Sequence, residues 1–60
     1  MTRLDWQINI ESLADRVAEN LGTEVALSAF RRTGATCFED LNPSEYESVF
    51  SDLMLMDSDC

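Results

Sequence analysis

Apolar residues recur at intervals of three and four between residues 10 and 21. The positions are Ile10, Leu13, Ala14, Val17, Ala18 and Leu21. This spacing places all of them on one face of an α-helix. Gly22 follows the last of them, and glycine readily adopts the left-handed conformation that ends helices. The pattern therefore predicts a helix that ends near residue 21.

The residues before this stripe allow more than one interpretation. Leu4, Trp6 and Ile8 alternate with polar residues, which is typical of a β-strand. A lone strand would find no pairing partner in this chain. If the helix extends back to about Asp5, Trp6 joins the apolar stripe while Leu4 and Ile8 point elsewhere. Residues 1–9 are therefore an arm, a strand or the first turns of the helix.

The segment TEVALSAFRR, residues 23–32, predicts a second helix. Thr23 can cap its first turn, and Arg31 and Arg32 fall in its last turn, where positive charge suits the helix dipole. Gly34 is expected to end it. Its inner face is formed by Val25, Ala26, Ala29 and Phe30.

Two capping signals follow in close succession. Thr36 with Glu39 at the third position matches a capping box and predicts one short turn of helix. Asn42 then repeats the device as a cap, with Pro43 at the first helical position and Glu45 at the third.

A final helix is predicted from residue 43 to about residue 56. Its core stripe is Tyr46, Val49, Phe50 and Leu53. The chain shows no repeat, linker or low-complexity segment. We therefore predict an all-α fold, a small bundle of three helices plus one short helical turn. Residues 1–60 form a single domain, and residues 57–60 are expected to be a flexible acidic tail.

A chain of 60 residues buries only about 60% of the surface that its unfolded form exposes, so its core is marginal. Such chains commonly gain stability from a partner or a second copy. Leu4, Trp6 and Ile8 lack an obvious place in a monomer core. They are therefore the candidates for self-association.

The C-terminal part carries a further pattern, Gly-Ala, then Glu-Asp-Leu, then Pro, Tyr and Val-Phe before a Leu. The residues are Gly34, Ala35, Glu39, Asp40, Leu41, Pro43, Tyr46, Val49, Phe50 and Leu53. This stretch resembles the C-terminal half of small, acidic, mostly uncharacterised proteins of bacterial mobile elements, including conjugative elements and phages. The resemblance covers under half of the chain and brings no catalytic set. It implies a setting, a small cytoplasmic protein of a mobile element.

Charge is unevenly distributed along the chain. Twelve acids and four arginines give a net charge of −8. Residues 39–60 hold seven of the acids and no basic residue. This balance disfavours direct binding to nucleic acids and to anionic membranes. No apolar run approaches the roughly 20 residues that cross a bilayer, and no secretory apolar segment is present near residue 1. We therefore expect a cytoplasmic protein.

The residues for familiar chemistries are missing. There is no histidine to serve as a base for a serine or cysteine nucleophile. Cys37 and Cys60 cannot complete a zinc site alone, and a disulfide between them is allowed only on count. Cys37 is expected to be a small buried apolar residue. We expect no catalytic residues, no cofactor and no metal.

The surplus acids form the candidate binding site. Spaced carboxylates can imitate the phosphates of nucleic acid, and duplex DNA carries one charge per about 1.7 Å of axis. Leu55 is expected on the polar side of the last helix, as an apolar anchor within an acidic rim. The predicted partner-binding residues are Asp40, Glu45, Glu47, Asp52, Leu55, Asp57 and Asp59. The competing interpretation is that these acids only keep the protein soluble.

These observations lead to two functional hypotheses. The first is a non-catalytic acidic protein that inhibits a bacterial nucleic-acid-binding defence complex, of the CRISPR type or a related one, by covering a basic surface. The alternative is a homodimeric structural or regulatory adaptor of a mobile element, in which the acids are solubilising. Both require a protein partner and neither requires nucleic acid or membrane.

Overall fold

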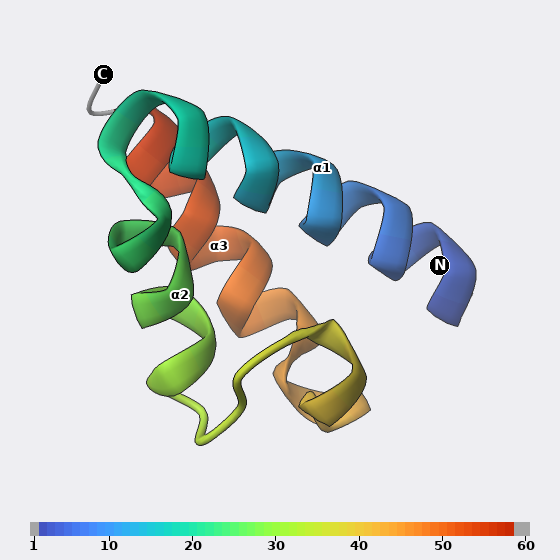
Figure 1. The fold of residues 1–60 in the computed structure, drawn as a ribbon. Coiled ribbons are helices and arrows are strands. Elements are labelled where there is room, and N and C mark those ends of the chain that lie inside the picture. Colours follow the sequence, from blue (N-terminus) through green and yellow to red (C-terminus); the bar gives the residue numbers. More distant parts are fainter. Residues whose placement is uncertain (1, 59–60) are drawn as a thin grey trace.

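The computed structural model describes residues 2–58. Three α-helices, α1 (Arg3–Leu21), α2 (Thr23–Arg31) and α3 (Tyr46–Ser58), follow one another in the chain (Figure 1). Between α2 and α3 lie two 3₁₀ turns, η1 (Phe38–Asp40) and η2 (Pro43–Glu45). The second turn runs directly into α3, so only η1 stands alone. The predicted all-α fold of three helices plus one short helical turn is confirmed.

The first turns of α1 are fixed by a capping box at Thr2. The Thr2 hydroxyl accepts a hydrogen bond from the backbone N–H of Asp5 at 3.2 Å, and the Asp5 carboxylate accepts one from the Thr2 N–H at 3.4 Å. These two bonds satisfy donors that a helix start otherwise leaves unpaired. Residues 3–9 are therefore helical and not an arm or a strand. Of the three alternating apolar residues, Trp6 faces the bundle, and Leu4 and Ile8 face outward.

Trp6 belongs to the core of the single chain. Its ring lies 6.1 Å from that of Tyr46 and 5.9 Å from that of Phe50, centroid to centroid. The expectation that Trp6 lacks a place in a monomer core is therefore wrong, because helix α1 turns it toward the core, where it is partly buried. Leu4 and Ile8 remain outside, with 63% and 55% of their surface exposed.

A single glycine joins α1 to α2. Gly22 has φ +109° and ψ 150°, its N–H donates to the Ala18 carbonyl, and its own carbonyl accepts from Val25 and Ala26. This backbone region is essentially restricted to glycine. Thr23 was expected to cap α2, but it is already the first helical residue. Gly22 occupies the cap position without a side-chain bond.

The end of α2 is closed by a Schellman-type arrangement. Gly34, at φ +88°, donates to the Arg31 carbonyl at 2.9 Å, and Ala35 donates to the Phe30 carbonyl at 3.1 Å. Ala35 and Phe30 are both buried, which is the apolar contact that usually accompanies this motif. The predicted stop at Gly34 is confirmed, and the motif directs the following segment back onto the bundle.

The two predicted caps before α3 had different outcomes. Thr36 does not cap η1; its hydroxyl donates to the Asp40 carboxylate at 2.6 Å, while Cys37 occupies the cap position. The expected capping box with Glu39 is therefore wrong. Asn42 does cap η2, because its side-chain oxygen accepts from the Ser44 N–H at 3.1 Å.

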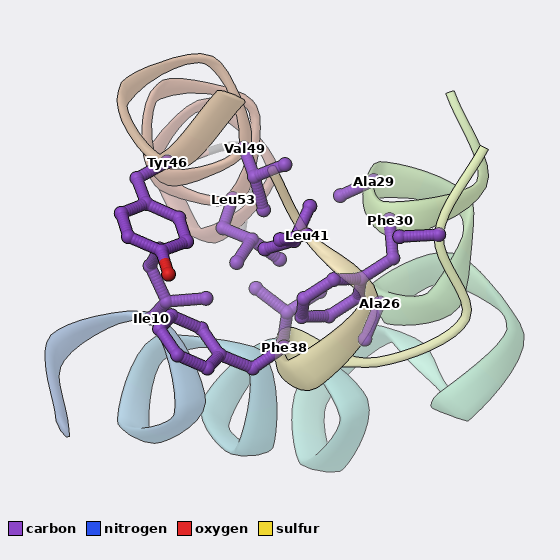
Figure 2. Close-up of a cluster of buried hydrophobic side chains, with 11 residues drawn as sticks. Ile10, Ala26, Ala29, Phe30, Phe38, Leu41, Tyr46, Val49 and Leu53 are labelled. Carbon is purple, nitrogen blue, oxygen red and sulfur yellow. The ribbon is translucent and has the colours of Figure 1, made fainter. Parts of the chain in front are cut away.

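The core collects side chains from all three helices and from the connection between α2 and α3 (Figure 2). Its buried members are Ile10, Val17, Ala26, Ala29, Phe30, Ala35, Phe38, Leu41, Tyr46, Val49 and Leu53. Most of the predicted stripe positions are among them. Three contributors, Ala35, Phe38 and Leu41, were not predicted as core because no helical period extends through a loop.

Helix α1 is the element on which the others assemble. Trp6 near its start meets Tyr46 and Phe50 near the start of α3, and Arg16 meets Asp57 near the end of α3. The two helices therefore run side by side in the same direction. Among the described helices, none combines the length and apolar character needed to cross a membrane.

Phe38 is the first residue to test in the core. Its ring stacks on that of Tyr46 at 4.9 Å with 17° between the planes, and it is 2% exposed. Phe38→Ala should lower the free energy of unfolding by about 3–5 kcal/mol. Proteins of this size have roughly 3–9 kcal/mol in total. Helical content by circular dichroism should therefore be largely lost.

Phe50→Ala is the matched comparison. Phe50 is only partly buried, so the same substitution should cost roughly half as much. Urea unfolding of both variants gives the ranking. A larger loss for Phe50→Ala than for Phe38→Ala would contradict this description of the core.

Gly22→Ala tests the corner between α1 and α2. No atom would clash with the added methyl group, so the cost arises from the backbone conformation alone. We expect a loss of about 1–3 kcal/mol in the free energy of unfolding. Ser51→Ala, at an exposed position of α3, is the control, and it should leave the free energy of unfolding unchanged or raise it slightly. Equal melting temperatures for Gly22→Ala and the parent would rule out the strained corner.

Candidate functional site

Arginine side chains tie the helices to one another. Arg16 of α1 lies 3.4 Å from the Asp57 carboxylate of α3, and Arg32, just after α2, lies 3.1 Å from that of Asp52. Both aspartates have only about a quarter of their side chain exposed (24% and 23%). These two pairs link α3 to α1 and to the end of α2.

The other two arginines also make contacts within the molecule. Arg31 lies 3.6 Å from Glu24 in the same helix, with both side chains well exposed. The Arg3 guanidinium lies over the Phe38 ring, 5.4 Å from its centroid, in a cation–π contact. All four arginines of the sequence therefore contact a carboxylate or a ring of the same chain, although their side chains stay largely exposed.

These pairs change the interpretation of two predicted site residues. Asp57 was expected in a flexible acidic tail, but α3 continues to Ser58, and Asp57 meets Arg16, 41 positions away in the chain. Asp52 is likewise neutralised by Arg32. Residues 57 and 58 thus belong to α3 and not to a flexible tail. Asp59, the remaining tail acid, lies outside the described residues.

Three further predicted residues lie around the start of α3. Asp40 is exposed and accepts the hydrogen bond from Thr36, Glu45 is partly buried, and Glu47 is exposed in the first turn of α3. A carboxylate in a first helical turn is favoured by the helix dipole. Asp40, Glu45 and Glu47 stand outside the three ion pairs.

Leu55 lies on the outer surface of α3, as its position in the helix predicts. It is 65% exposed, and the neighbouring Met54 is 52% exposed. Glu47, Ser51 and Leu55 follow one another at four-residue spacing and so share one face of the helix. The structure therefore brings Glu47 and Leu55 onto one outward face and turns Asp52 and Asp57 toward the flanking helices.

A second set of exposed acids was not among the predicted partner-binding residues. Glu11, Asp15 and Glu19 are exposed at four-residue spacing along α1, outside the ion pairs of the described chain. Their positions on the polar side of a helix were evident from the sequence. What the sequence did not indicate is that the arginines near them are turned away to α3 and Phe38.

Residues 2–58 offer little for metal binding or thiol chemistry. That part of the chain holds no cluster of three or more potential metal-ligating side chains. Cys37 is exposed, so its expected burial is wrong; the loop turns Phe38 inward instead.

Comparison of the chain with protein-family models, curated proteins and solved structures gave no match.

The ion pairs of α3 yield a stability prediction. Asp52→Asn and Asp57→Asn should each lower the free energy of unfolding by about 0.5 kcal/mol, since exposed arginines make weak pairs. If Asp52 and Asp57 had no arginine partner, their replacement would leave the free energy of unfolding unchanged or raise it, because an acid near a helix C-terminus, such as Asp57, opposes the helix dipole. Urea unfolding at low ionic strength measures the loss.

Glu19→Gln serves as the control for these variants. It removes the same charge from the last turn of α1, where an acid opposes the helix dipole. Stability should stay constant or rise slightly. High salt should shrink the effect of Asp52→Asn, and a loss as large in Glu19→Gln as in Asp52→Asn would show that the pairs contribute nothing.

Proposed function

We propose that this chain is a non-catalytic binding protein that covers a basic surface of a protein partner. The observation that carries the proposal is the internal use of all four arginines. Eight acids of residues 2–58 stand outside the three ion pairs. They are Asp5, Glu11, Asp15, Glu19, Glu39, Asp40, Glu45 and Glu47. The arginines of the ion pairs are still exposed, but each is matched by an acid, so the net unmatched charge that a partner meets on residues 2–58 is negative.

An excess of charge of one sign acts mainly on association. Complementary potentials steer encounters and raise the association rate, and they disfavour partners of like charge. A basic surface that holds nucleic acid binds through its attraction to a dense row of negative charges, and an acidic face can make use of the same attraction. The partner class that fits is a nucleic-acid-binding protein. Its basic groove would be occluded by the acidic face of this molecule.

Exposed apolar side chains give such an interface an anchor. Leu55 and Met54 stand outward on α3, and Leu55 lies about two helical turns beyond Glu47. Buried apolar groups at the centre of an interface, surrounded by polar residues, usually supply most of the binding energy. Charge would bring the partner to this face, and Leu55 would slow its dissociation.

The resemblance to small proteins of bacterial mobile elements suggests where the partner belongs. In that setting the economical role is inhibition of a host defence complex that binds nucleic acid, of the CRISPR type or a related one. The mechanism would be occlusion of the groove in which the complex holds its nucleic acid.

A homodimeric adaptor is the second candidate function. The exposure of Leu4 and Ile8 at the start of α1 favours it, because apolar side chains on one helix face can be covered by another copy. This role predicts a dimer by analytical ultracentrifugation and association that strengthens with salt. Occlusion of a basic groove predicts weakening with salt.

Binding by the parent chain tests the proposed function. The immobilised protein should retain its partner from a bacterial lysate at low ionic strength. It should release that partner at about 1 M salt, where the Debye length is about 3 Å. Added duplex DNA should also release it, because both ligands occupy one surface. Retention that is insensitive to salt and to DNA would contradict occlusion.

Paired variants locate the charges that matter. Glu45→Gln with Glu47→Gln should slow association by about threefold and flatten its salt dependence, since these acids steer the partner. Glu19→Gln with Glu39→Gln removes the same charge from two exposed acids on α1 and η1 that also stand outside the ion pairs, and it should change little. Leu55→Glu adds charge but should weaken binding through faster dissociation. If both double variants behave alike, net charge and not this face determines binding.

A further inference from the structure

One face of α1 carries apolar and acidic residues in a fixed order. Leu4, Ile8, Glu11 and Asp15 are separated by four, three and four residues, so they form one stripe on the helix. All four are exposed. The stripe spans roughly 16 Å along the axis. In Figure 1 the first turns of α1, which carry Leu4 and Ile8, extend beyond α2.

A groove opens beside the acidic half of this stripe. It has a volume of about 420 Å³ and lies between α1, α2 and the connection at residues 36–38. Leu27, Phe30 and Phe38 contribute apolar lining, and Glu11 and Asp15 stand on its α1 side. The groove thus combines an apolar wall with two exposed carboxylates.

Two other grooves on the molecule carry less uncompensated negative charge: the one between α1 and α3 has no unpaired acid in its lining, and the one beside α3 has only Glu47. One, between α1 and α3, contains Arg16 with Asp57, and the other, beside α3, contains Arg32 with Asp52. In both, an arginine and an aspartate already neutralise each other. The groove beside Glu11 and Asp15 is lined by no arginine.

We infer that this stripe and groove form a second docking surface. Its occupant is a helical segment of a protein partner. That segment carries a pair of apolar residues and, about two helical turns further along, an arginine. Arginine fits because its aliphatic stem packs on apolar walls while its guanidinium binds carboxylates. Leu4 and Ile8 would cover the apolar pair. The inference rests on the proposed role in binding basic protein surfaces, and it adds a face on α1 to the one on α3.

A second copy of this chain is a poor occupant. Each copy carries a net charge of −8, and its four arginines are held by Phe38 and by carboxylates of the same molecule. Docking of another copy would leave Glu11 and Asp15 without a cation and close to further acids. Charge complementarity therefore selects a basic partner over self-association.

The probe for this surface is a capped, alanine-rich helical peptide. It bears two leucines four residues apart and two arginines about two turns further along one face, and it is made in both chain orders. Titration into the isotopically labelled full chain, followed by NMR, should give saturable shifts. They should be centred on Leu4, Ile8, Glu11, Asp15 and Leu27. A peptide with glutamine in place of arginine should bind much more weakly.

Matched variants check that the stripe itself binds. Ile8→Ser should weaken peptide binding by about tenfold, whereas Met54→Ser, which alters an equally exposed apolar residue on α3, should not. Glu11→Gln with Asp15→Asn should weaken it by about fivefold. Glu45→Gln with Glu47→Gln is the charge control and should have little effect.

Two results would overturn the inference. One is the absence of saturable shifts with either peptide order up to about 1 mM, the concentration that marks the weakest useful affinity. The other is a set of shifts centred on Glu47 and Leu55 of α3, in which case the proposed function stands and the α1 face is not a site. Salt-insensitive partner retention with intact peptide binding would instead refute the proposed function alone.

Discussion

The stack of Phe38 on Tyr46 is the contact on which this small fold depends. The connection between α2 and α3 adds Phe38, Ala35 and Leu41 to the core formed by the three helices. Phe38 also receives the guanidinium of Arg3 from the start of α1. One loop residue thereby links the beginning of the first helix to the beginning of the last, which a chain of 60 residues needs because its core is marginal.

The scarcity of basic residues is the second constraint. With four arginines against twelve acids, the fold places every arginine against a carboxylate or a ring of the same molecule. Each such contact is weak at an exposed site. Together they leave uncompensated negative charge at the surface, because no arginine remains to neutralise the acids of α1 and of the first turns of α3. The same four side chains therefore add a little to stability and determine which acids remain unmatched at the surface.

The two candidate faces differ in how charge and apolar surface are combined. On α3, Glu47 and Leu55 share an outward face that is otherwise rich in serine, whereas α1 presents Leu4 and Ile8 next to a groove with Glu11 and Asp15. The first suits a broad basic surface and the second a segment with one inserted arginine. A partner that engages both would wrap around the acidic side of the molecule, and contacts at two linked sites strengthen each other through effective concentration.

The sequence by itself determined the three helices, most of their inner faces, the stop at Gly34 and the Asn42 cap, because these depend on local spacing and on the backbone preferences of single residues. Tertiary structure alone decided the rest. Phe38 is buried and Cys37 exposed because a non-periodic loop folds over the core, and Trp6 faces inward because α3 lies beside it. Asp52 and Asp57 are neutralised by arginines far away in the chain, so one-dimensional charge counting overstated the surplus on the last helix and overlooked that on the first.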